Sequence, residues 1–104
     1  MGIRISIPKK ETVAFCERWN IAELAFFGSV LRDDFSSESD IDVLVNPHPG
    51  ISHSISNILR MERELGDILG REVDLVFRPD VERSRNYIRR EAILKSAEVF
   101  YEAR

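Results

Sequence analysis

The chain has 104 residues and a formal net charge of −3 at pH 7, and 43% of its residues are hydrophobic and 32% charged. These values predict one soluble globular domain over residues 1–104 with a modest core. They argue against an extended nucleic-acid footprint, which is usually a basic face. No apolar run approaches the roughly 20 residues of a membrane span, and residues 1–6 lack the apolar core of a signal peptide.

The first predicted helix covers residues 8–20, and Pro8 is well placed near its first turn. Val13, Phe15 and Cys16 stand among its apolar positions. Cys16 is the only cysteine, so no intrachain disulfide can form. We therefore predict a buried thiol in a protein of the reducing cytoplasm.

A predicted strand over residues 21–27 ends at a Gly-Ser pair. Gly28 lets the backbone turn and approach a ligand closely. Ser29 offers a hydroxyl and an N–H group where a short helix would begin, and this suits phosphate oxygens. A Gly-Ser pair alone is a common turn dipeptide, so its meaning depends on the residues that follow.

The next predicted strand begins at Asp40 and alternates, with Asp40, Asp42 and Leu44 on one face and apolar residues on the other. Two carboxylates on a rigid strand opposite a phosphate-binding turn predict a site for a divalent metal and a nucleotide. An EF-hand loop is excluded, because its sixth and twelfth positions, counted from Asp40, hold Val45 and Ile51 in place of Gly and Glu.

After a break at residues 46–50, apolar residues at helical spacing predict a helix over residues 52–69. Gly70 suits its C-cap. Glu62 lies inside the apolar arc, either as a rim residue paired with an arginine or as a functional residue. His48 and His53 lack cysteine partners, which argues against zinc; they are either solvent-exposed or in contact with a nucleotide base or acceptor.

Residues 71–77 predict a third strand, with Val73, Leu75 and Phe77 on one face and Asp74 on the other. An acid in this place is costly unless it is solvated, paired or bound to metal. If this strand lies beside the one that carries Asp40 and Asp42, Asp74 reaches the same metal pair.

The last predicted helix begins near Val81 and passes through Leu94, and residues 97–101 either continue it or form a short strand. Its arginines fall on two stripes, which are typical of a solvated face but could also bind a triphosphate or an acidic partner. These arginines are Arg83, Arg85, Arg89 and Arg90. The alternation of helices and strands predicts an α/β sandwich with one mixed sheet.

Gly28-Ser29, a ten-residue spacer, Asp40-x-Asp42 and Asp74 on a later strand resemble the nucleotidyltransferase superfamily related to DNA polymerase beta. Within it the chain is most similar to the minimal nucleotidyltransferases (MNT), small prokaryotic proteins that are often the antitoxins of HEPN-domain toxins. The resemblance implies a single-domain polymerase-beta-like palm, with a mixed sheet and helices mainly on one face.

The resemblance also implies a set of site residues. Asp40 and Asp42 would bind two Mg²⁺ ions, and Asp74 would bind the metal nearer the acceptor and serve as general base. Gly28 and Ser29 would hold the β- and γ-phosphates of ATP.

Arg32 matches an arginine that is frequent after the Gly-Ser pair in this family. It would either support the phosphates or form a surface salt bridge with Asp33 or Asp34. Asp33 stands where many relatives carry glycine, and it adds negative charge near the phosphates.

The function implied by the resemblance is that of an antitoxin, which transfers AMP from ATP to a tyrosine of a cognate HEPN ribonuclease toxin and so inactivates it. Three strands and their helices leave no room for a separate acceptor-binding domain, so the acceptor would either dock on this small surface or arrive with a partner protein. Two alternatives stay open: a non-catalytic antitoxin that covers its toxin, and nucleotidyl transfer to a small molecule or an RNA end. A homo-oligomer also stays open.

Overall fold

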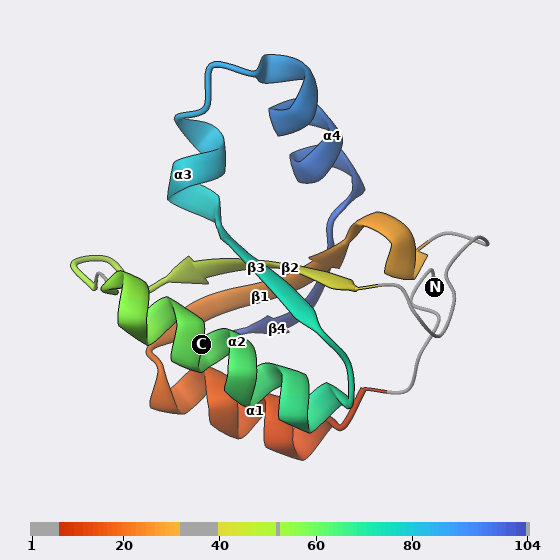
Figure 1. Cartoon of the computed structure of the whole chain (residues 1–104). Coiled ribbons are helices and arrows are strands. Elements are labelled where there is room, and N and C mark those ends of the chain that lie inside the picture. The colour runs from red at the N-terminus through yellow and green to blue at the C-terminus, as the bar shows by residue number, and fades with distance from the viewer. Residues whose placement is uncertain (1–6, 32–39, 52, 104) are drawn as a thin grey trace.

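The computed structural model describes residues 7–31, 40–51 and 53–103, and for residues 29 and 30 the backbone alone (Figure 1). The elements in chain order are α1 (Lys9–Arg18), β1 (Ile21–Phe27), the 3-10 turn η1 (Gly28–Leu31), β2 (Ile41–Pro47), α2 (Ile55–Leu69), β3 (Val73–Phe77), α3 (Arg78–Glu82), α4 (Tyr87–Ser96) and β4 (Glu98–Glu102). None of the helices in these ranges is long and apolar enough to cross a membrane.

The sheet is mixed, as predicted, with the strand order β3-β2-β1-β4. β1 runs antiparallel to both of its neighbours, β2 and β4, whereas β2 and β3 are parallel. The connection between the parallel strands is α2, as a parallel pair requires a crossover. β3 is therefore an edge strand, and the neighbour on its inner side is the strand that carries Asp42.

One face of the sheet packs against α1 and α2 (Figure 1). Its buried residues alternate along the strands and recur at helical spacing along α1 and α2, as the periodicity predicts. They are Phe15, Cys16, Ile21, Leu24, Phe26, Ile41, Val43, Val45, Met61, Leu65 and Leu75. Burial, with the charge of Glu17 as the second cause, raises the pKa of the Cys16 thiol to about 12. The prediction of a buried thiol is confirmed.

The helix α2 ends at Leu69, as its sequence predicts, but it begins at Ile55 rather than at residue 52. The Ser54 hydroxyl accepts a hydrogen bond from the Asn57 N–H at 3.2 Å, which satisfies one unpaired donor of the first turn. Gly70 adopts a left-handed φ of 71° and its N–H donates to the Gly66 carbonyl at 2.7 Å. This tight end places β3 directly after the helix.

The opposite face of the sheet carries α3 and α4, which rise away from it (Figure 1). A smaller buried cluster anchors them, made of Ala25, Phe27, Leu44, Val81 and Ile93. Where one last helix is predicted, there are two: the chain leaves the helical path at residues 83–86, and Asn86 caps α4 by accepting from the Arg89 N–H at 3.2 Å. Residues 97–101, left open by the sequence, contain most of β4.

Candidate active site

The register of the sheet brings Asp42 and Asp74 together. Asp42 is paired with Asp74 across the parallel strands β2 and β3. Paired residues on neighbouring strands point to the same face and lie about 4.8 Å apart, so both carboxylates lie on the face that carries α3 and α4. Asp42 is half-buried and Asp74 is exposed. The adjacency on which the predicted metal pair depends is present.

Gly28 lies directly against the Asp42 carboxylate. Phe27, at the end of β1, is paired with Asp42 across the antiparallel strands, and Gly28 follows with a φ of 77°. A Cβ atom at Gly28 would lie 2.2 Å from Asp42 Oδ2. Glycine is therefore required here twice, by the left-handed backbone and by the space that the carboxylate occupies. The predicted turn and the predicted acid meet in one place.

Asp40 stands at the entrance to β2. It is exposed, and the next residue, Ile41, donates its N–H to the Glu72 carbonyl at 2.9 Å, which ties the start of β2 to β3. In the described ranges, no three Asp, Glu, His or Cys side chains come close enough together to hold a metal ion. Asp42 and Asp74 thus form the centre of the candidate site, and Asp40 lies two residues before Asp42.

Four residues named from the sequence are not described in full. Arg32, Asp33 and Asp34 lie outside the described residues, and Ser29 is described by its backbone alone, in η1. The roles predicted for Arg32 and for the Ser29 hydroxyl stay predictions.

A cavity of about 600 Å³ lies beside Gly28, between η1 and α4. Apolar side chains form much of its wall, and Arg89, Ser96 and Glu98 supply the polar groups. The lining residues are Phe27, Gly28, Leu31, Arg89, Ala92, Ile93, Ser96 and Glu98. Arg89 was a candidate binding residue from the sequence, whereas Ser96 and Glu98 were not. For Ser96 the only signal in the sequence is its i, i+4 spacing from Ala92, which places both residues on one face of a helix. That spacing does not reveal which face of α4 lies over the sheet, and Glu98 has no comparable signal.

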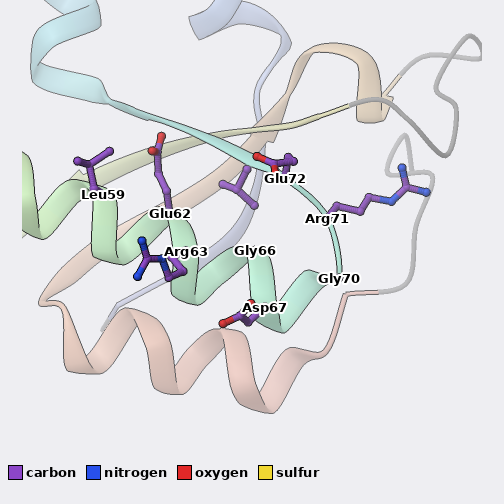
Figure 2. Close-up of a pocket in the computed structure, with 9 residues that line it drawn as sticks. Leu59, Glu62, Arg63, Gly66, Asp67, Gly70, Arg71 and Glu72 are labelled. Atoms are coloured by element: carbon purple, nitrogen blue, oxygen red, sulfur yellow. The ribbon is translucent and has the colours of Figure 1, made fainter.

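A second cavity, of about 550 Å³, lies between α2 and the outer edge of β3 (Figure 2). Figure 2 shows Glu62 reaching from α2 toward β3, where its Oε2 atom accepts a hydrogen bond from the Leu75 N–H at 2.8 Å. Neither interpretation of Glu62 from the sequence anticipated this backbone partner. The cavity lies along α2, whereas Asp74 points to the opposite face of the sheet.

The two histidines lie beyond the far end of β2 from Asp42. The His53 ring packs against Trp19 and Phe77, with ring centroids 5.9 and 5.7 Å apart. His48 is exposed and its N–H donates to the Asn20 carbonyl at 3.0 Å. For His48 the solvent-exposed alternative is confirmed, and neither ring lies next to the carboxylate pair.

The chain is similar in sequence to a known protein family and to several named proteins. The sequence profile of the nucleotidyltransferase domain matches residues 12–97. A protein of Methanocaldococcus jannaschii, provisionally named a protein adenylyltransferase, is 33% identical over 70 residues, which are 67% of this chain and 69% of that protein. The protein adenylyltransferase MntA of Thermococcus cleftensis is 34% identical over 62 residues, which are 60% of this chain and 61% of that protein.

Two solved structures have a similar fold. A toxin–antitoxin structure with AMP-PNP matches with a TM-score of 0.71 at 14% identity, over 94% of this chain and 76% of that chain. A structure provisionally described as a minimal nucleotidyltransferase matches with a TM-score of 0.65 at 27% identity, over 86% of each chain.

Proposed function

Because the chain belongs to the nucleotidyltransferase domain family and is an enzyme of that class, we propose that it transfers AMP from ATP to a tyrosine of a partner protein. The partner in this proposal is an HEPN-domain ribonuclease toxin, which the transfer inactivates, so that the chain acts as an antitoxin in the cytoplasm. The observation that carries the proposal is the contact of Gly28 with Asp42, in register with Asp74.

The comparisons support a protein acceptor. Relatives at 33% and 34% identity carry the name protein adenylyltransferase, and similar folds occur in toxin–antitoxin structures. In our proposal residues 1–104 form one nucleotidyltransferase domain, and the partner supplies the acceptor tyrosine. The exposure of Asp74 supports this arrangement, because a hydroxyl on another protein can reach it.

The donor set fits magnesium. Asp42 and Asp74 present carboxylate oxygens from adjacent positions of two strands, and oxygen ligands are those that Mg²⁺ prefers. We assign the ions to Asp42 and Asp74 together with Asp40, whose side chain would have to turn toward this pair when metal binds, because the three carboxylates do not converge on one point in the structure. Two Mg²⁺ ions, when bound, would neutralise the charge that develops on the attacking and leaving oxygens.

The phosphates would bind at the turn after β1. Without a Cβ atom, Gly28 leaves the backbone of η1 open to a close approach by phosphate oxygens. We assign the β- and γ-phosphates to Gly28 and Ser29, with Arg32 as a supporting contact. The nucleoside would occupy the cavity beside Gly28, because about 600 Å³ with apolar walls and a few polar groups is typical of a small-molecule site.

The transfer is a displacement at the α-phosphorus of ATP. The tyrosine hydroxyl oxygen attacks the α-phosphorus of ATP, and the bond from that phosphorus to the bridging oxygen of the β-phosphate breaks. Pyrophosphate leaves with the electron pair of that bond. The phenolic proton passes to the Asp74 carboxylate as general base, and the partner retains a tyrosine–AMP phosphodiester.

Intact mass spectrometry tests the proposal directly. We predict that a neighbouring gene encodes an HEPN-domain protein. That protein is incubated with the chain, ATP and Mg²⁺, and in parallel with the Asp40→Ala, Asp42→Ala variant. We expect a mass gain of one or more AMP groups with the wild-type chain and none with the variant. Tight binding of the two proteins without a mass gain would contradict catalysis and favour an antitoxin that acts by covering its toxin.

A further inference from the structure

The segment between α3 and α4 concentrates positive charge. Residues 83–90, here called the arginine segment, contain four arginines and no acidic residue, in a chain whose net charge is −3. Arg83 pairs with Asp80 at 2.7 Å and Arg90 donates to the Ser84 carbonyl at 2.9 Å. Within the described part of the chain, the guanidinium groups of Arg85 and Arg89 have no carboxylate partner.

The same segment exposes two large apolar side chains. Tyr87 is 62% exposed and Ile88 is 70% exposed, whereas Ile93, one and a half turns further along α4, is buried against the sheet. Arginine and tyrosine, with tryptophan, are enriched among the residues that carry most of the binding energy at protein interfaces. The outer side of the first turn of α4 therefore has the composition of a contact surface that no part of the described chain covers.

The arginine segment also adjoins the candidate active site. α3 and α4 rise from the sheet face that carries Asp42 and Asp74 (Figure 1). Arg89, at the C-terminal part of the segment, lines the cavity beside Gly28. A polypeptide bound along the segment would lie next to the groups that we assign to the transfer.

We propose that the arginine segment is the docking surface for an acidic polypeptide segment that carries the acceptor tyrosine. This inference rests on the proposed function and adds the chemistry of the acceptor's surroundings. Carboxylates on the acceptor would pair with Arg85 and Arg89, and apolar side chains would cover Tyr87 and Ile88. Charge complementarity of this kind speeds association and selects partners. A polypeptide is favoured over a nucleic acid because the arginines flank the exposed Tyr87 and Ile88, which apolar side chains of a polypeptide can cover.

Binding of a defined polymer tests the docking surface without knowledge of the natural partner. The probes are a fluorescently labelled random copolymer of glutamate and tyrosine, a copolymer of lysine and tyrosine, and single-stranded poly(U) RNA. We expect the wild-type chain to bind the acidic copolymer most tightly, with an affinity that falls as salt is added. Equal or tighter binding of poly(U) or of the basic copolymer would overturn the proposal.

A double variant outside the proposed catalytic groups tests the residues. Arg85→Glu with Ile88→Asp changes two exposed positions, and Lys10→Glu, exposed on α1, is the matched charge reversal away from the segment. We expect the double variant to bind the acidic copolymer about tenfold or more weakly, and the control to match the wild type. The proposal is wrong if the double variant binds as the wild type does, or if the control loses as much.

Two further readouts separate this inference from the proposed function. Affinity for a fluorescent ATP analogue with Mg²⁺ should be unchanged in the double variant, and AMP transfer to the cognate toxin should show a raised KM with kcat preserved. If the double variant transfers AMP with an unchanged KM, the docking role of the arginine segment is wrong, but the proposed function still stands. Failure of the wild-type chain to modify the toxin would remove the proposed function, whereas the copolymer result would still decide the docking surface.

Discussion

The two faces of the sheet differ in how much apolar surface they bury and in whether they carry site residues. The face that packs against α1 and α2 is filled by apolar side chains, and Phe26, Val43 and Leu65 are fully buried. The other face carries Gly28, Asp42 and Asp74, and α3 and α4 are anchored to it by a much smaller cluster. Substitutions on the first face should therefore change the free energy of unfolding, and substitutions on the second face should change transfer.

The largest effect on stability is expected from Leu65→Ala. Leu65 is fully buried between α2 and the sheet, so its truncation should lower the free energy of unfolding by about 2–5 kcal/mol. Leu59→Ala, at a 58% exposed position of the same helix, should cost about 0.5 kcal/mol or less. Urea denaturation measures both. Equal losses of unfolding free energy in the two variants would show that burial of Leu65 between α2 and the sheet does not stabilise the fold.

The largest effect on transfer is expected from Asp42→Asn. This change keeps the shape of the side chain and removes its charge, so AMP transfer per folded molecule should fall by about 10²-fold or more, with little change in the urea midpoint. Asp67→Asn on α2 removes an exposed carboxylate from the other side of the sheet and should leave transfer intact. Single-turnover transfer of labelled AMP is the measurement. Comparable loss in both variants would contradict a local role for Asp42.

Two glycine substitutions separate the cost of a left-handed backbone from the effect of crowding the Asp42 carboxylate. Gly28 and Gly50 both have positive φ, 77° and 84°, but an added Cβ meets Asp42 at Gly28 and nothing within 4 Å at Gly50. Gly50→Ala should cost about 1–2 kcal/mol of stability through the left-handed backbone alone. Gly28→Ala should cost more and also abolish transfer. If Gly28→Ala retains full transfer, the close approach of Gly28 to Asp42 is not part of the site.

A pH dependence that is absent at pH 7 and develops only above pH 9 is expected on the apolar face. Burial raises the pKa of the Cys16 thiol from its ordinary 9.0 to about 12, so the folded state keeps a proton that the unfolded state releases. This contribution to stability is complete below pH 9 and is lost as the pH rises from 9 toward 12. Burial also raises the pKa of Tyr101, which adds to the decline above pH 10. Melting temperatures of the wild type and Cys16→Ala should converge over this range; parallel curves would contradict the assignment.

Much of the sheet and its helices could be predicted because apolar periodicity is a local signal. It indicated the strand that contains Asp42 and the long helix that ends at Gly70. It also indicated that Asp74 lies on the polar face of the third strand. The adjacency of Asp42 and Asp74 could only be stated as a condition, because strand pairing depends on contacts far apart in the sequence. The turn at Gly28 was expected opposite the carboxylates, but the register that places Gly28 directly against Asp42 depends on the same long-range pairing.

The less local features were harder to anticipate. The division of the last helix depends on where α3 and α4 find apolar partners on the sheet, through Val81 and Ile93, and not on a strong break in the sequence. Ser96 and Glu98 became cavity residues only once β4 returned beside β1. The backbone partner of Glu62 required knowledge that β3 is an edge strand.

The hydrogen bond from the Leu75 N–H to Glu62 has a consequence for self-association. The outer edge of a sheet offers unpaired backbone donors to any passing strand, and this is a common route to aggregation. Leu75 is the middle residue of β3, and its outward N–H is already held by a carboxylate from α2. A strand that added to β3 would have to displace a charged acceptor, so polymerisation of the sheet is opposed at this edge.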